Sequence, residues 1–269
     1  MCKECGCGLN AGGVRIGGHA HGLTHHDHDH HHGEEHHGHS HSSAPQTVNL
    51  NRSLLEKNDR LAERNRGFFG AKKLLVLNVV SSPGSGKTTF IRETAAALAK
   101  KFRVGVVVGD LATDNDAARL RTAGIPVVQI TTGTVCHLDA DMVAKAAAQL
   151  DLDALDILVI ENVGNLVCPA DYDLGEDLRV VLLSTTEGED KPLKYPPMFH
   201  SAQVAVVTKS DLAEAAGFNR EQALTNLRRI SHHAELFELS AKTGAGMKPW
   251  LEFLGKQVPR KVKKTKTKE

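Results

Sequence analysis

A glycine-rich loop between an apolar run and a helix-like stretch constrains the fold of this chain more than any other feature. Residues 74–80 are almost entirely apolar, residues 81–88 read SSPGSGKT, and residues 90–100 have the composition of a helix. A strand, a glycine loop and a helix in this order form a phosphate-binding loop, because backbone N–H groups and a helix N-terminus together attract anions. The alternative, a chance Gly/Ser turn before a helix, is disfavoured by the flanking pattern. The sequence therefore predicts a nucleotide-binding protein.

The expected phosphate contacts come from the end of this loop and the start of the helix: Gly84, Ser85, Gly86, Lys87, Thr88 and Thr89. Lys87 would contact the β- and γ-phosphates, and the Thr88 hydroxyl would bind Mg²⁺. One position departs from the usual G-x-x-x-x-G-K-[ST] pattern, because Ser81 occupies the place of the first glycine. Gly84 and Gly86 keep the flexible positions, so we interpret Ser81 as a variation typical of one family.

Apolar runs and helix-like stretches alternate through the rest of the chain. Further strands are expected at residues 103–108, 127–130, 157–160, 180–183, 204–207 and 236–239. Further helices are expected at residues 114–122, 140–150, 219–230 and 247–257. This alternation predicts an α/β fold of the P-loop NTPase class, with a mostly parallel sheet and helices on both faces.

Two segments that follow late strands indicate which base the nucleotide carries. The residues expected at the base lie within 208–211 and 240–242: Lys209, Asp211, Ser240, Ala241 and Lys242. The Asp211 carboxylate can accept hydrogen bonds from N1–H and the 2-amino group of guanine, whereas adenine would leave it unpaired. Lys209 would lie along the base, and Thr208 replaces the usual Asn, which weakens a local tether. Together the two segments favour GTP over ATP.

Acidic residues end two of the expected strands, where the ligands of parallel sheets gather. Asp110 could bind Mg²⁺ through water or orient the attacking water, with a simple acidic strand cap as the alternative. Glu161 opens the segment ENVG, whose Gly164 would sense the γ-phosphate. Asp114 and Asp116 could instead be the N-cap and a first-turn residue of the next helix.

The residues expected to take part in hydrolysis are Lys87, Thr88, Asp110 and Glu161. No glutamine stands in a water-orienting position, and no arginine finger can be assigned. Slow intrinsic hydrolysis is therefore expected.

Cysteines and histidines crowd the start of the chain. Cys2, Cys5 and Cys7 place three thiols close together, and the Cys2 amine could be a fourth donor after removal of the initiator methionine. So compact a set favours Ni²⁺, although Zn²⁺ would also bind. Twelve of the sixteen histidines lie within residues 19–41, interrupted by acids and glycines, which suits storage of a divalent ion better than an engineered tag.

A further set of metal-binding residue types lies inside the α/β region. Cys136 and His137 are adjacent just before a helix, and Cys168 follows the segment that begins at Glu161. Adjacent side chains usually point apart, so one protomer would not close a four-coordinate site alone, whereas two protomers across a two-fold axis could. Two structural cysteines and a lone histidine are the alternative. A metal bound here would respond to the state of the nucleotide.

Composition excludes several classes of protein. The formal net charge of +1 over 269 residues argues against a general nucleic-acid binder. No apolar run approaches the length of a membrane span, and no secretory leader opens the chain. The cysteines do not form a disulfide framework, which favours a cytoplasmic location. The expected organisation is a metal-binding tail at 1–47, disordered without metal, an amphipathic helix at 48–70, a P-loop GTPase domain at 71–258 and a basic tail at 259–269.

These motifs together resemble the HypB family, the GTPases that help insert nickel into [NiFe]-hydrogenase. The resemblance is carried by CKECGC at residues 2–7, the histidine-rich insert, SSPGSGKT, the Cys136-His137 pair, ENVGNLVCP at 161–169 and EGEDKPLKYP at 187–196. It implies a GTP-dependent homodimer with Cys136, His137 and Cys168 at its interface. It also implies a HypA-type metallochaperone partner and delivery to the hydrogenase large subunit, with Lys191 reaching toward the nucleotide of the neighbouring protomer.

The expected function is a GTPase whose hydrolysis gates nickel transfer. A urease-type nickel GTPase is disfavoured by the N-terminal thiol motif and by KPLK at residues 191–194. A passive nickel-storage protein is disfavoured by the intact Lys87, Thr88 and Asp211. A P-loop kinase or ATPase would need an acceptor pocket that the sequence does not indicate.

Overall fold

Strand β2, Leu75–Ser81, is buried along its whole length, as expected for a central strand covered on both faces. The computed structural model describes residues 15–16 and 44–265. The other strands are β1 Arg15–Ile16, β3 Val104–Asp110, β4 Val127–Thr131, β5 Ile157–Glu161, β6 Leu178–Ser184, β7 Val204–Thr208 and β8 Glu235–Glu238. Their order across the sheet is β1-β4-β3-β5-β2-β6-β7-β8, and neighbouring strands are parallel except β1 with β4.

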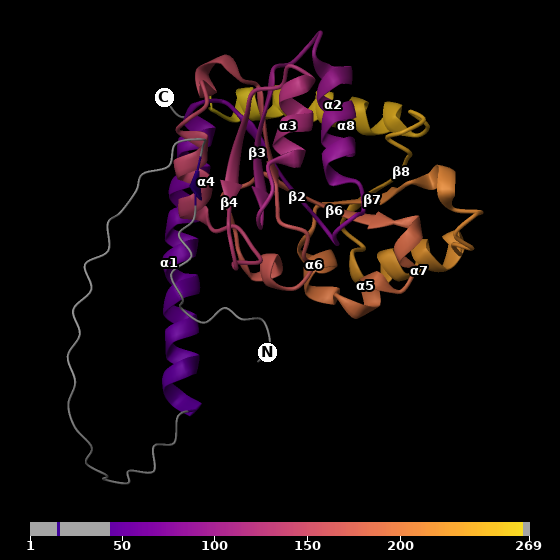
Figure 1. Ribbon diagram of the computed structural model, residues 1–269, viewed down its shortest axis with the longest axis horizontal. Helices are drawn as coiled ribbons and strands as arrows, with labels where there is room; N and C mark the ends of the chain where they lie inside the picture. The colour runs from indigo at the N-terminus through magenta and orange to yellow at the C-terminus, as the bar shows by residue number, and fades with distance from the viewer. Residues whose placement is uncertain (1–14, 17–43, 266–269) are drawn as a thin grey trace, which may run out of the picture.

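Helices pack on both faces of this sheet, which Figure 1 shows edge-on between them. The helices are α1 Ala44–Ala71, α2 Lys87–Leu98, α3 Asn115–Thr122, α4 Ala140–Ala147, α5 Lys191–Lys194, α6 Pro196–Ser201, α7 Arg220–Ile230 and α8 Met247–Thr265. One face packs against α2, α3 and α8, and the other against α1, α4, α6 and α7. A P-loop NTPase fold with a mostly parallel sheet and helices on both faces is thereby confirmed.

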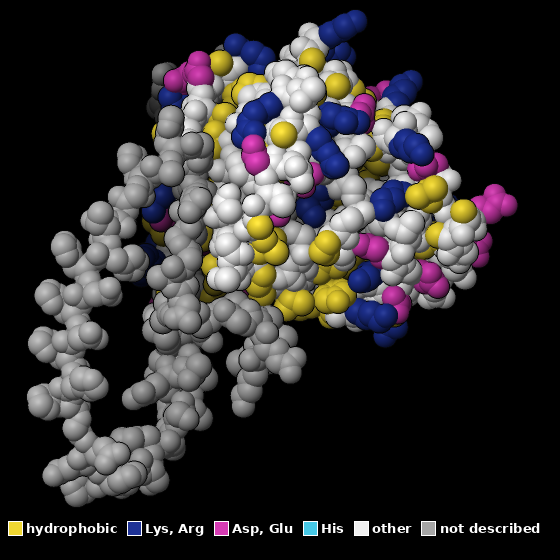
Figure 2. All heavy atoms as spheres, viewed as in Figure 1, with side chains coloured by type: hydrophobic (Ala, Val, Ile, Leu, Met, Phe, Trp, Pro, Cys, Tyr) yellow, Lys and Arg dark blue, Asp and Glu magenta, His cyan; other side chains and the backbone are white. Residues whose placement is uncertain are grey.

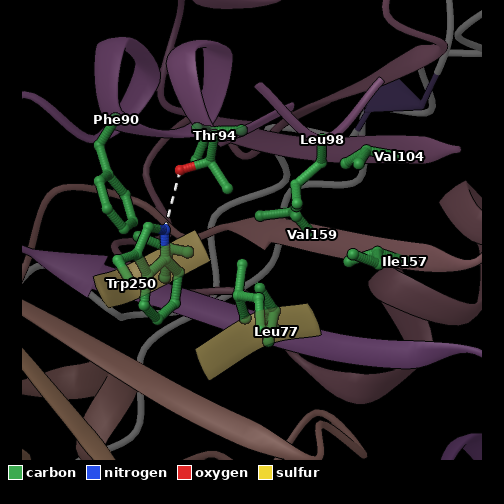
Figure 3. Close-up of a pocket in the computed structure, with 11 residues that line it drawn as sticks. Leu77, Phe90, Thr94, Leu98, Val104, Ile157, Val159 and Trp250 are labelled. Atoms are coloured by element: carbon green, nitrogen blue, oxygen red, sulfur yellow. Dashed lines mark hydrogen bonds between the residues drawn. The ribbon is translucent and has the colours of Figure 1, made fainter. Parts of the chain in front are cut away.

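An apolar cluster beneath α2 forms one half of the core (Figure 3). Leu77 and Val159 from the sheet, Phe90 from α2 and Trp250 from α8 line the same small pocket. The Trp250 indole N–H donates to the Thr94 hydroxyl at 3.0 Å, so the one polar side chain of this lining already has its partner. The pocket is therefore core packing rather than a ligand site.

Several helix boundaries differ from those expected from the sequence. Helix α1 begins at Ala44, α2 begins at Lys87, and α8 continues through Thr265 into the lysine-rich segment. The strand β1, within the expected tail, and the short helices α5 and α6 were not expected. Such short elements carry too few residues to show a hydrophobic period.

The two edges of the sheet are different. At one edge β1 pairs antiparallel with β4, with Arg15 opposite Thr131. At the other edge β8 pairs with β7 and carries Glu238, whose carboxylate accepts two hydrogen bonds of 2.6 Å from Arg220. Within residues 15–16 and 44–265, no helix combines the length and the apolar character needed to traverse a bilayer.

Candidate functional site

The loop between β2 and α2 has the backbone geometry of an anion cradle. Gly84 and Gly86 adopt positive φ angles of 75° and 95°, a conformation that glycine takes without strain. Helix α2 starts directly after Gly86 and buries Lys87 and Thr88 in its first turn. The N–H groups of this turn therefore face the loop, as anion binding at a helix N-terminus requires.

Ser81 is the internal partner of the loop lysine. The Lys87 ammonium donates to the Ser81 hydroxyl at 2.9 Å, and the Ser85 hydroxyl donates to the same oxygen and to the Ser82 carbonyl at 2.9 Å. Burial lowers the pKa of Lys87, and neighbouring carboxylates oppose this effect. From the sequence, Ser81 was interpreted only as a variation at a glycine position. A serine hydroxyl can accept from an ammonium, but the approach of Lys87 to it depends on the curvature of the loop.

Glu161, at the end of β5, faces the first turn of α2. The Thr88 hydroxyl donates to Glu161 Oε1 at 2.7 Å. The second oxygen, Oε2, is buried and has no hydrogen-bond partner among the described residues. Burial raises the pKa of Glu161 to about 7, against the opposing effects of the Thr88 hydrogen bond and the Lys87 charge. An unsatisfied carboxylate oxygen beside a threonine hydroxyl fits the oxygen donors that Mg²⁺ prefers.

Further carboxylates lie near this pair. Asp110, at the end of β3, accepts from the Leu111 N–H at 2.6 Å and from the Thr113 hydroxyl at 2.5 Å. The charges of Asp110 and Asp116 both contribute to raising the pKa of Glu161. Asp116 was expected as a first-turn residue of a helix, and it does lie in the first turn of α3.

Asp114 is the N-cap residue of α3, although its side chain makes no capping hydrogen bond. It pairs instead with Arg121 at 2.6 Å. Its place before the helix is as the sequence indicated, and its carboxylate is used in an exposed ion pair.

The residues expected at the base lie against the other side of the loop. The Lys209 ammonium donates to the Gly84 carbonyl at 2.7 Å, and the Thr208 hydroxyl donates to the Ser85 carbonyl at 3.0 Å. The Thr208 hydroxyl therefore tethers this segment to the loop, and whether it does so more weakly than the usual Asn stays a prediction. The Ser210 N–H donates to the Leu239 carbonyl at 3.2 Å, which joins the two base segments. Ser240 is buried, Ala241 is half-buried, and Asp211 and Lys242 are exposed.

Cys136, His137 and Cys168 converge although two of them are adjacent in the chain. Their ligand atoms all lie within 4.8 Å of one another, and the two sulfurs are 3.0 Å apart. The His137 ring stacks on Tyr172 with centroids 3.9 Å apart. Burial lowers the pKa of His137, against the opposing charge of Asp139, and its buried Nδ1 has no hydrogen-bond partner among the described residues. The expectation that adjacent side chains would point apart was wrong here.

One segment connects the loop to the thiols. Gly164 packs so closely on the loop that a Cβ there would lie 3.0 Å from the Pro83 Cα. The next residue, Asn165, donates through its side-chain amide to the Cys136 carbonyl at 3.2 Å. Cys168 then begins the short helix η2, Cys168–Asp171. Residues 161–168 therefore contact both the phosphate loop and the thiol pair.

Lys191 and the residues of the amino-terminal tail were also expected to bind nucleotide or metal, but no described contact connects them to the phosphate loop or to the thiol pair. Lys191 begins α5, and its ammonium lies 5.3 Å from the centre of the Tyr195 ring. Cys2, Cys5, Cys7 and the histidines of residues 19–41 lie outside the described residues.

The fold and the loop define a P-loop nucleotide-binding protein, and comparisons with known proteins agree. A family profile described as CobW/HypB/UreG, nucleotide-binding domain, matches residues 75–238. The chain is 52% identical over 204 residues to the hydrogenase maturation factor HypB of Escherichia coli strain K12, covering 76% of this chain and 70% of that relative.

Solved structures agree with the profile. The crystal structure of HypB from Helicobacter pylori in complex with nickel matches with a TM-score of 0.73 and 41% identity, covering 76% of this chain and 96% of that one. The structure of HypB from Archaeoglobus fulgidus matches with a TM-score of 0.71 and 39% identity, covering 76% and 99%. The chain belongs to the HypB family of hydrogenase maturation factors.

Proposed function

We propose that this protein is a GTP-hydrolysing metallochaperone that binds nickel and drives its insertion into the large subunit of a [NiFe]-hydrogenase. Membership of the HypB family supports the role in hydrogenase maturation, and the related structure in complex with nickel supports the cargo. The reaction belongs in the cytoplasm, where thiols stay reduced and able to exchange a metal ion.

A single observation carries the coupling between hydrolysis and metal transfer. Residues 161–168 contact the phosphate loop through Glu161 and Gly164, and contact the thiol pair through Asn165 and Cys168. A change at the γ-phosphate that shifts this segment also shifts Cys168 relative to Cys136. The effect on nickel affinity can be no larger than the difference in metal binding between the two nucleotide states, typically about 1–3 kcal/mol.

In this proposal each loop residue has a chemical task. Lys87 neutralises the β- and γ-phosphates, and Thr88, Asp110 and Glu161 hold Mg²⁺, which would stabilise the charge that develops on the transferred phosphoryl group. Asp211 selects guanine, while Lys209 packs along the base. The buried, unpaired oxygen of Glu161 supports its assignment to the cation.

The nickel cargo would bind Cys136, His137 and Cys168, with Zn²⁺ as a competitor because both ions accept thiolate and imidazole. Three donors from one chain leave a position for a donor from a second copy. We therefore include a GTP-dependent homodimer in the proposal, with Lys191 directed toward the neighbouring nucleotide. Leu111, Val167 and Leu193 are exposed apolar residues after strands or in α5, and Figure 2 shows hydrophobic side chains gathered along the lower edge of the body.

The remaining elements of the proposal concern exchange with partners. Cys2, Cys5 and Cys7 would bind Ni²⁺ tightly, and the histidine tract would store further ions. A HypA-type metallochaperone would exchange nickel with the protein before delivery to the large subunit. The formal net charge is only +1, so the proposal includes no nucleic acid among the partners.

The test is a nickel titration of the full chain loaded with GDP or with a non-hydrolysable GTP analogue. The proposal expects nickel affinity at the inner thiol site to differ between the two states, and Cys168→Ser to remove that site in both. Asn165→Ala, which breaks the contact to Cys136 without removing a metal ligand, should reduce the difference. Equal nickel affinities in the two nucleotide states would refute the coupling.

A further inference from the structure

Three exposed histidines that the proposed function does not use lie together on the surface. Outside the tract at residues 19–41, the chain has His137 and three others, namely His200, His232 and His233. The rings of His200 and His233 have centroids 5.4 Å apart, and those of His232 and His233 are 5.3 Å apart. Both pairs meet edge to face, and all three side chains are exposed.

The backbone that carries these rings is held in place from both sides. His200 lies near the end of α6, and His232 and His233 follow the end of α7. The Ser231 hydroxyl, which is buried, donates to the Phe199 carbonyl at 2.6 Å. This bond joins the residues directly before His200 and His232. Figure 1 shows α6 and α7 on the same side of the sheet, so the juxtaposition follows from helix packing.

One of the imidazoles has its tautomer set by the backbone. His200 Nδ1 lies 3.2 Å from the Ile230 carbonyl oxygen. A carbonyl oxygen can only accept, so Nδ1 carries the proton and Nε2 keeps its lone pair. An imidazole with Nδ1–H bonded to a carbonyl and Nε2 free is the arrangement in which histidine binds transition metals.

We propose that His200, His232 and His233 form a surface site for a divalent transition-metal ion such as Ni²⁺, distinct from the thiol site. Imidazole nitrogens suit Ni²⁺, Cu²⁺ and Zn²⁺, and water completes the coordination of an exposed site. The nitrogens of the three rings do not converge on one point in the structure, so the exposed rings of His232 and His233 would have to turn toward the Nε2 of His200 for an ion to bind. Binding at these histidines would require neither GTP hydrolysis nor a hydrogenase as the destination of the metal.

The position of this site relates it to the inner thiols. The Arg179 guanidinium donates to the Ser201 hydroxyl at 2.9 Å and to the Ala170 carbonyl at 3.0 Å. Ser201 follows His200 at the end of α6, and Ala170 lies in η2, the short helix that starts at Cys168. Helix α6, which carries His200, therefore lies beside η2, which begins at Cys168.

The test uses the full chain with ¹⁵N-labelled backbone, and Ni²⁺ is added beyond the capacity of the amino-terminal cysteines and histidines. Paramagnetic Ni²⁺ in an imidazole and water site broadens nearby amide signals, so those of Ser201 and Ala234 should broaden. His200→Gln with His233→Gln should abolish this broadening, and His233→Gln alone should weaken it. The remaining amide signals report whether each variant stays folded.

His137→Gln is the matched control, because it removes an imidazole from the inner site. It should leave the broadening at Ser201 and Ala234 unchanged. Undiminished broadening in the double variant, or none in the unmodified chain, would overturn the proposal.

Discussion

Glu161→Gln should change the dependence of stability on pH. Burial raises the pKa of this carboxyl from 4.5 to about 7 in the folded protein. The folded state then holds the proton more tightly than the unfolded state. The resulting stabilisation is complete below pH 4.5 and is lost as the pH rises through about 7. At about 1.4 kcal/mol per tenfold change in proton affinity, the loss is about 3 kcal/mol.

Glutamine has the same shape and accepts the Thr88 hydrogen bond through its carbonyl, but it does not ionise. The difference in the free energy of unfolding between the variant and the unmodified protein, measured by urea in nucleotide-free buffer with a chelator, should therefore shift in favour of the variant by about 2–3 kcal/mol from about pH 5 to about pH 8. Glu214→Gln removes an exposed carboxyl and is the control. Its free energy of unfolding should differ from that of the unmodified protein by the same amount at both of these pH values.

Addition of Mg²⁺ with a GTP analogue offers a second check on the same residue. A cation beside the carboxylate favours its charged form, so the loss of stability at high pH should shrink in the unmodified protein. Parallel pH profiles for the two proteins without ligand would show that Glu161 titrates normally and that the reasoning from burial is wrong.

Three further changes test other parts of the structure. Asp211→Asn should weaken GTP binding about tenfold to a hundredfold and improve XTP binding, because the amide can donate to the 2-carbonyl of xanthine; unchanged base preference in competition binding would contradict this. Gly164→Ala should lower GTP hydrolysis about tenfold through crowding against Pro83, with thermal stability as the control, and wild-type turnover would refute the close approach. Trp250→Phe should lower the free energy of unfolding by about 1–3 kcal/mol, measured in urea, whereas no loss would mean that the indole is not packed as described.

The fold could be predicted from the sequence because its central strands are buried on both faces. Residues 74–80 form a continuous apolar run, which is what β2 requires at the centre of a parallel sheet. The start of α2 was placed too late, at Phe90, because Lys87 and Thr88 are polar although their backbone is helical. Strand β1 has two residues, too few for any period to be visible.

The site was predictable wherever one segment carries its own pattern, and less so where contacts cross between segments. The loop residues and the acid at Glu161 follow from spacing and strand ends. That Cys136 and His137 turn to the same side depends on the conformation of the backbone after β4, which residue types do not specify. The contact of Ser81 with Lys87 likewise depends on the curvature of the loop.

The acidic edge strand β8 restricts how two copies of the chain can meet. A second β8 aligned against the first would bring the exposed Glu235 of each copy to the shared border, where like charges repel, whereas the charge of Glu238 is already compensated by Arg220. Extension of the sheet into a continuous ribbon across two molecules is thus disfavoured at this border. An assembly of the protein would instead use surfaces away from β8, which leaves the carboxyl ends of the strands available for contact.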